Sequence, residues 1–164
     1  MRISITKRFV YFTEQDFKTN YMLLLILLTA AFAATTLKTI FSFAAAELFR
    51  QPYQEPYLLA ALVSHFNVCD TKTNRYIGVG IQYVLGLLFV IGFQLLLNKG
   101  WVTLSYESIL LYGTLIGILS MLGWLFMFMQ ARSKPQMNSY GYYTQLFVAN
   151  IVFAFTMAGC YIII

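Results

Sequence analysis

Lys38 and Glu47 are the residues best placed for chemistry, because both lie within or at the end of a long apolar stretch. A charge inside a membrane is costly, so such residues usually face protein or a water-filled cavity. At about 100° per residue, Lys38 shares a helix face with three alanines, and Glu47 lies on the opposite face. We predict that Lys38 is shielded by protein. The alternative is that Lys38 extends to the outer headgroups and that Glu47 pairs with Arg50.

Two amides form a second group of candidates for polar contacts. Gln82 stands between Gly78 and Gly86 at intervals of four residues, so the three share one helix stripe. Asn150 lies in the last apolar stretch and is a candidate partner for Gln82. Interhelical hydrogen bonds of this kind contribute about 0.6 kcal/mol on average, so we interpret both amides as structural.

Small residues mark one face of the stretch around residues 108–129. Gly113, Gly117, Ser120, Trp124 and Tyr106 share this face, and Gly113 and Gly117 have the spacing of a helix-packing motif. We predict that this face contacts protein. The functional alternative is a groove that admits a lipid or quinone tail beside the glycines. The opposite, lipid-facing side is predicted to hold Leu111, Leu115, Ile118, Leu122, Leu125 and Met129.

The elements that position these residues are four apolar helices. The chain of 164 residues is 60% hydrophobic and 10% charged, which is typical of membrane proteins. A helix needs about 20 apolar residues to cross the hydrocarbon core. The predicted spans are residues 21–46, 78–97, 108–129 and 145–164. We therefore predict an all-α polytopic membrane protein, a single domain over residues 1–164, with four transmembrane helices in an antiparallel bundle of sequential neighbours.

Two further helical segments are expected outside the spans. In the first loop, Pro56 is well placed to begin a short helix over residues 56–66 that lies on or dips into the membrane surface. Before the first span, a sequence like a capping box predicts a helix that begins near Glu14 and turns inward around Asn20. The alternative for this N-terminal segment is an exposed basic tail.

The net charge of +5 is spread in ones and twos around the ends of the apolar runs. This pattern favours a lipid bilayer as partner and disfavours nucleic acid. A basic group of Arg2, Lys7, Arg8 and Lys18 precedes the first span, so we predict cytoplasmic N- and C-termini in a bacterial inner membrane. A cleaved signal sequence ending at residues 31–33 is the less favoured alternative.

Catalytic and metal-binding patterns are weak. His65 is the single histidine, and with Cys69 and Asp70 it supplies too few ligands for a metal site. The sequence has no nucleophile-elbow, zinc-protease or phosphate-loop motif. We therefore expect no enzyme activity, metal or cofactor. Cys69 and Cys160 should lie toward opposite membrane faces, too far apart for a disulfide.

The first two spans also resemble those of uncharacterised small four-helix inner-membrane proteins of bacteria. Residues 33–39, Ala-Ala-Thr-Thr-Leu-Lys-Thr, and Ala46-Glu47-Leu48 resemble the first-span pattern of this group. Gln82-x-x-x-Gly86 resembles the start of its second span. The group more often has His at the position of Gln82 and Met at that of Lys38. The resemblance implies a helical bundle and no activity.

Three functions are compatible with these features. The first is a non-catalytic membrane protein, such as a subunit or assembly partner of a membrane complex, because the polar residues suffice for helix packing. The second is a carrier or binder of a small hydrophobic molecule, a lipid or quinone, with Lys38 contacting its headgroup. The third is an intramembrane enzyme.

Overall fold

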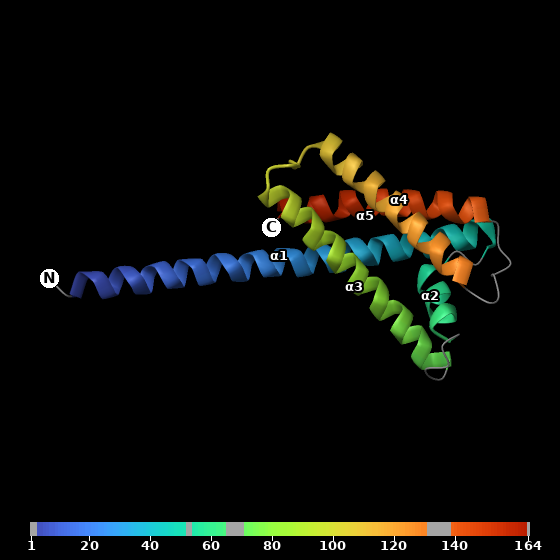
Figure 1. The fold of residues 1–164 in the computed structure, drawn as a ribbon, viewed down its shortest axis with the longest axis horizontal. Helices are drawn as coiled ribbons and strands as arrows, with labels where there is room; N and C mark the ends of the chain where they lie inside the picture. The colour runs from blue at the N-terminus through green and yellow to red at the C-terminus, as the bar shows by residue number, and fades with distance from the viewer. Residues whose placement is uncertain (1–2, 52–53, 65–70, 131–138, 164) are drawn as a thin grey trace.

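The computed structural model describes the backbone of residues 3–51, 54–64, 71–130 and 139–163, and the side chains of residues 21–51, 54–61, 73–129 and 139–163. Helices make up nearly all of this part of the chain (Figure 1). They are α1 (Ile3–Phe49), α2 (Glu55–Ser64), α3 (Thr71–Asn98), α4 (Tyr106–Gln130) and α5 (Ser139–Ile163).

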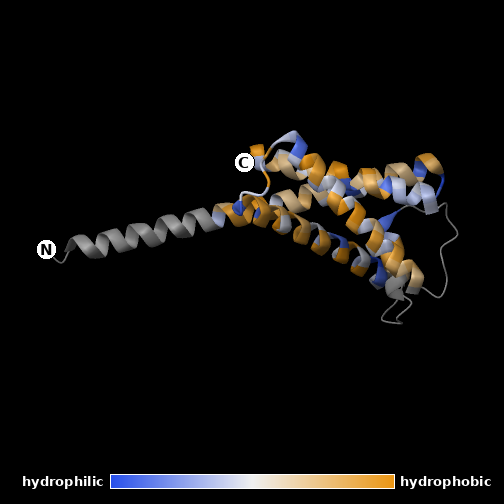
Figure 2. Ribbon diagram, turned by 45° about the horizontal axis from the view of Figure 1, so that its top comes forward, coloured by the Kyte–Doolittle hydropathy of each residue, from blue (hydrophilic) through white to orange (hydrophobic). Residues whose placement is uncertain are grey.

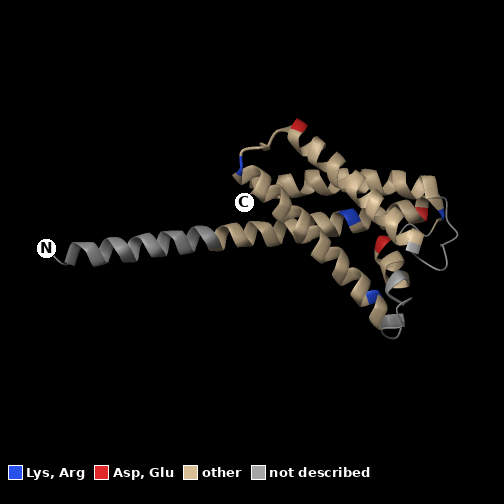
Figure 3. Ribbon diagram, viewed as in Figure 1, with Lys and Arg blue, Asp and Glu red and all other residues tan. Residues whose placement is uncertain are grey.

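The four predicted spans are confirmed. The segments long and apolar enough to cross a membrane are Tyr21–Phe49, Thr73–Asn98, Tyr106–Met129 and Ser139–Ile163. The second and the fourth begin earlier than the sequence indicated. Apolar residues cover most of the described ribbon (Figure 2), and its few charged residues are widely spaced (Figure 3). The protein is therefore a multi-pass, all-α membrane protein.

Helix α1 differs from the prediction at its N-terminal end. It begins at Ile3 and passes through Glu14 and Asn20 without a break, so a helix start near Glu14 and a turn near Asn20 are wrong. No glycine or proline occurs between Ile3 and Phe49, so nothing interrupts its backbone hydrogen bonds.

Helix α1 ends in a tight turn at Arg50 and Gln51. Arg50 has a φ of 50°, in the left-handed region. Its N–H donates to the carbonyl of Glu47, and the N–H of Gln51 donates to the carbonyl of Ala46. This pair of bonds is a Schellman motif, which usually has glycine at the left-handed position.

The short helix in the first loop is confirmed, and it packs against the bundle. It runs across the direction of α1 (Figure 1) and lies against the first half of α3. A Cβ on Gly78 of α3 would clash with the Pro56 carbonyl and would lie 2.9 Å from the Ala60 nitrogen. Close contact at Gly78 thus sets the position of α2 and of its first residue, Glu55.

The spans do not all pack in chain order. Helix α1 packs against α3 and α5, and α4 packs against α5, whereas the backbones of α3 and α4 make little direct contact over the described residues. The two helices meet through Tyr112, whose hydroxyl donates to the Phe89 carbonyl and whose ring lies 4.9 Å from that of Phe93. The prediction that consecutive spans are neighbours is therefore wrong for α3 and α4.

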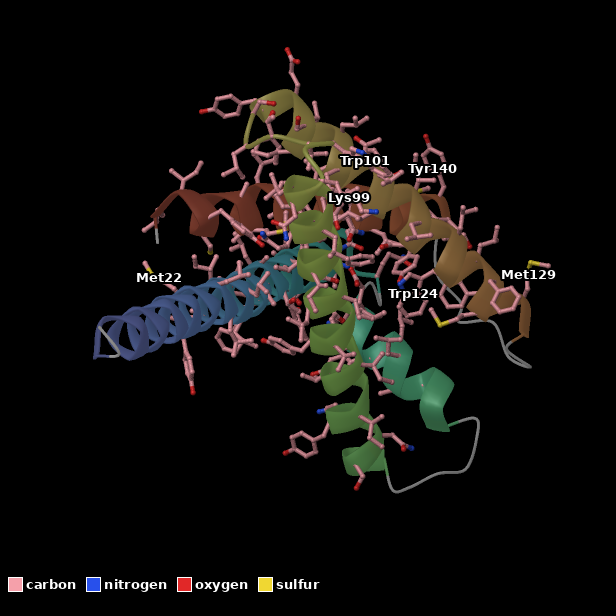
Figure 4. The ribbon with its side chains drawn as sticks, turned by 60° about the vertical axis from the view of Figure 1, so that its left-hand side comes forward. Met22, Lys99, Trp101, Trp124, Met129 and Tyr140 are labelled. Carbon is pink, nitrogen blue, oxygen red and sulfur yellow. The ribbon has the colours of Figure 1, made fainter. Side chains whose placement is uncertain are left out.

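The predicted faces of α4 are confirmed with one exception. Gly113, Gly117 and Trp124 are buried and Ser120 is half-buried, but Tyr106 is exposed. A Cβ on Gly113 would lie 3.1 Å from the Ile151 Cα of α5, so the two backbones approach closely there. Figure 4 shows Trp124 pointing inward from α4 and Met129 pointing away. The residues predicted to face lipid are all exposed: Leu111, Leu115, Ile118, Leu122, Leu125 and Met129.

Candidate functional site

A buried ion pair lies at the centre of the candidate site. The Lys38 Nζ on α1 lies 3.1 Å from the Glu55 Oε2 at the start of α2, and the two side chains are 10% and 4% exposed. Lys38 is buried on the same α1 face as Ala31, Ala34 and Ala45, as the spacing predicted. Because each charge has an opposite partner, neither is left uncompensated inside the protein.

The two predicted amides both belong to this cluster. Lys38 Nζ donates to Asn150 Oδ1 on α5 at 3.1 Å, and Gln82 Nε2 on α3 donates to Glu55 Oε2 at 3.4 Å. The Asn150 Nδ2 is held by the Leu146 carbonyl at 2.8 Å, which leaves Oδ1 free to accept from Lys38. The prediction of a direct Gln82–Asn150 bond is wrong, because the ion pair lies between the two amides.

Hydrogen bonds from α1 fix the rest of the cluster. The Glu55 backbone N–H donates to Ser42 Oγ at 3.4 Å, which joins the first turn of α2 to α1. Gln82 Nε2 also donates to Thr39 Oγ1 at 3.4 Å. A negative charge in the first turn of a helix interacts favourably with the helix dipole, and Glu55 occupies this position in α2.

Three buried oxygen atoms of the cluster have no hydrogen-bond partner in the described part of the protein. They are Glu55 Oε1, Gln82 Oε1 and Thr35 Oγ1. Leaving a buried polar group without a partner costs about 1–3 kcal/mol, so partners from outside the chain are expected.

These three residues line a cavity of about 330 Å³. Lys38 lines it too, but most of its wall is apolar and comes from α3 and α4. The cavity exists because α3 and α4 separate beyond Tyr112. It reaches the surface that faces lipid, since Leu85, Leu119 and Leu122 line it and are exposed. Its other lining residues are Leu59, Gly86, Phe89, Ser120, Gly123, Trp124, Met127 and Phe153.

Not all predicted site residues lie at this cavity. Gly86 and Ser120 line it, and a Cβ on Gly86 would clash with the Thr35 hydroxyl. Gly113 and Gly117 are covered by α5, so the predicted groove beside them does not exist, and the cavity lies further along α4. Glu47 is exposed outside the cluster.

Neither Lys38 nor Glu47 behaves as the alternative interpretation expected. Within the described part of the chain, no ion pair joins Glu47 to Arg50. Lys38 is buried in protein and does not extend to the surface, so the prediction that it is shielded is confirmed.

Glu55 was not among the residues predicted from the sequence, because the predicted helix of the first loop begins one residue later, at Pro56. In the structure Glu55 is buried against α1, where it contacts Lys38 and Ser42. One signal was available, because an intramembrane lysine usually has an acidic partner and Glu55 directly precedes a helix-starting proline. Thr35 was also missed, because threonine is common in membrane helices and carries no special signal.

A second cavity of about 410 Å³ lies between α1 and α5. The described side chains that line it include no charged residue. Gln145 is buried at its edge, and neither amide atom of Gln145 has a hydrogen-bond partner in the described structure. The second cavity therefore offers a single amide and lacks the ion pair of the first.

Metal binding finds no support among the described side chains, which contain no group of three His, Cys, Asp or Glu residues. His65, Cys69 and Asp70 lie outside the described residues. The described site can therefore form hydrogen bonds through an ion pair without net charge, two amides and a hydroxyl, and these groups lie next to an apolar cavity.

Comparisons with known proteins add no further constraint. No protein-family model, curated protein or solved structure matches the chain. The resemblance to small four-helix inner-membrane proteins stays a prediction.

Proposed function

We propose that this protein binds or carries a small hydrophobic molecule that has a polar group and that enters from the bilayer. The observation that supports this most strongly is the buried Lys38–Glu55 pair at a lipid-facing cavity, with Glu55 Oε1 unpartnered. A ligand would place its polar group at Glu55 and its apolar part between α3 and α4. No bond-making chemistry is needed, so the proposal is a non-catalytic protein.

The size and lining of the cavity agree with such a ligand. Sites for small molecules typically measure about 300–1,000 Å³ and combine apolar walls with a few polar groups. A cavity of about 330 Å³ holds a headgroup and the first part of a tail. The rest of the tail would lie along Leu119 and Leu122 in the surrounding lipid.

Two glycine substitutions test this proposal. Gly123 lines the cavity, and a Cβ there meets no atom within 4 Å, so Gly123→Leu should fill the cavity without disturbing the fold. Gly159 on α5 has equally open space and does not line the cavity, so Gly159→Leu is the matched control. Each protein would be purified from membranes, and its retained small molecules identified by mass spectrometry.

We expect a molecule that is retained by wild type and by Gly159→Leu to be lost from Gly123→Leu. The same retained molecules in all three proteins would contradict the proposal.

A subunit or assembly partner of a membrane complex is the second candidate function. Gln145 favours this function, because neither amide atom has a hydrogen-bond partner in the described structure and the residue lines the second cavity. A helix of another subunit could supply the missing hydrogen bonds. A polypeptide that co-purifies in fixed stoichiometry, and is lost from Gln145→Leu, would support this function. Absence of such a polypeptide from gently solubilised membranes would count against it.

We also propose that the protein lies in a bacterial inner membrane with both termini in the cytoplasm. The basic residues before the first span support this orientation. A membrane-impermeant maleimide added to intact cells should then label Cys69 and leave Cys160 unlabelled. Labelling of Cys160 alone would invert the orientation.

A further inference from the structure

We infer that the polar group of the ligand is an uncharged hydroxyl that donates a hydrogen bond to Glu55 Oε1. The site would then select long-chain alcohols, and the hydroxyl-bearing quinols, over ethers, quinones and fatty acids. This inference rests on the proposed function and adds the chemical class of the ligand. It follows from the hydrogen bonds that the cluster leaves unfilled and from its net charge.

Most donors of the cluster are in use. Gln82 Nε2 has two N–H groups and two acceptors, Glu55 Oε2 and Thr39 Oγ1. The Lys38 ammonium has three N–H groups, and two of them are directed to Glu55 and Asn150. One N–H of Lys38, the second N–H of Asn150 Nδ2 and the O–H of Thr35 are the donors that remain in the described structure.

Two strong acceptors of the cluster are unfilled, whereas Glu55 Oε2, Asn150 Oδ1 and Thr39 Oγ1 each accept a hydrogen bond. Glu55 Oε1 and Gln82 Oε1 are buried and accept no hydrogen bond in the described structure. A carboxylate is an acceptor only, so a partner for Glu55 must donate. A hydroxyl donates to Glu55 and can also accept from Lys38 or Thr35. An ether or a quinone carbonyl only accepts, so it would leave both acceptors unfilled.

The charge of the cluster favours a neutral ligand. Lys38 and Glu55 neutralise each other at 3.1 Å, and no other charged side chain among the described residues lines the cavity. A fatty-acid carboxylate would bring a second negative charge to Glu55, and an ammonium would bring a second positive charge to Lys38. Burying a third, uncompensated charge is far more costly than burying a hydrogen-bonded hydroxyl.

Three probes with the same chain test the inference on the wild-type protein. They are hexadecanol, hexadecyl methyl ether and palmitate. The full-length protein would be placed in lipid nanodiscs, and the affinity of each probe measured by native mass spectrometry. Because no substitution is made in the cluster, a failure of folding cannot complicate the result. Gly123→Leu serves as the blocked control, and Gly159→Leu as the open one.

We expect hexadecanol to bind wild type and Gly159→Leu about tenfold or more tightly than the ether, since the ether forfeits the bond to Glu55. Palmitate should bind more weakly than hexadecanol, and Gly123→Leu should bind no probe. Equal affinity for alcohol and ether, or tighter binding of palmitate, would overturn the hydroxyl assignment and leave the proposed function standing. If no probe binds and Gly123→Leu retains the same native molecules as wild type, both fail.

Discussion

Removal of one charge of the buried pair should be far more damaging than removal of both. Lys38→Met keeps the length of the side chain but deletes the ammonium, which leaves the Glu55 carboxylate buried with Gln82 as its remaining partner. It also deprives Asn150 Oδ1 of its donor. Breaking a buried ion pair from one side typically costs about 3–5 kcal/mol. We expect a loss of that size for Lys38→Met, and a similar one for Glu55→Leu, which leaves the ammonium unpaired.

The double variant Lys38→Met/Glu55→Leu should recover most of this loss. It buries no charge, and replacement of an ion pair by apolar residues of similar size is often neutral or stabilising. The coupling energy between the two sites should therefore exceed about 2 kcal/mol, well above the error of a double-mutant cycle. It would be measured by unfolding of the four proteins in detergent micelles.

Lys99→Met is the matched control for this cycle. Lys99 lies exposed at the end of α3, with its ammonium 5.0 Å from the centre of the Trp101 ring (Figure 4). Its removal should cost about 0.5–1 kcal/mol. Additive effects at Lys38 and Glu55, or single variants as stable as Lys99→Met, would refute the buried pair.

Three further predictions concern helix packing and backbone conformation, and all are measured by thermal unfolding in detergent. Gly78→Ala should destabilise the protein by about 1–3 kcal/mol, because the added Cβ would clash with the backbone of α2. Gly80→Ala is the control and should be neutral, because open space surrounds Gly80. Equal effects of the two substitutions would contradict the α2–α3 contact. Gly117→Leu should lower the stability by about 1–3 kcal/mol, because the new side chain would clash with a side chain of α5. Leu115 faces lipid, so Leu115→Ala should lower the stability only slightly. Equal melting temperatures of the two variants would show that the faces of α4 are assigned wrongly. Arg50→Gly should stabilise the protein by about 1 kcal/mol, because glycine adopts a positive φ without strain. A loss of stability would show that the arginine side chain itself contributes to stability.

The sequence predicts the spans and their faces because both depend on local spacing. Apolar length alone locates the four membrane helices, and helical periodicity places Lys38 on the buried face of α1 and Leu115 on the exposed face of α4. The same periodicity puts Gly78, Gln82 and Gly86 on one buried stripe of α3. These features need no knowledge of how the helices are arranged.

Features that depend on the path of the chain were not predictable in this way. Glu55 reaches Lys38 because α1 ends at a left-handed Arg50 and α2 begins beside α1, at Ser42, and arginine gives no signal for such a turn. The separation of α3 and α4 likewise contradicts the usual rule for short loops. It arises because α4 packs on α5 through glycines, whereas Tyr112 bridges α3 and α4 near their connected ends.

The two parts of the site come from different helices, and this division bears on its use. The polar groups belong to α1, α2, α3 and α5, and their mutual hydrogen bonds hold those four elements together at one point. Helix α4 contributes the apolar wall, including Leu119 and Leu122, and none of the cluster's described hydrogen bonds. A buried ion pair is weak evidence for a role in stability, since apolar residues can often replace it without loss. Its position at a lipid-facing cavity, whose wall comes partly from a helix that takes no part in the described polar network, is what the proposed binding function requires.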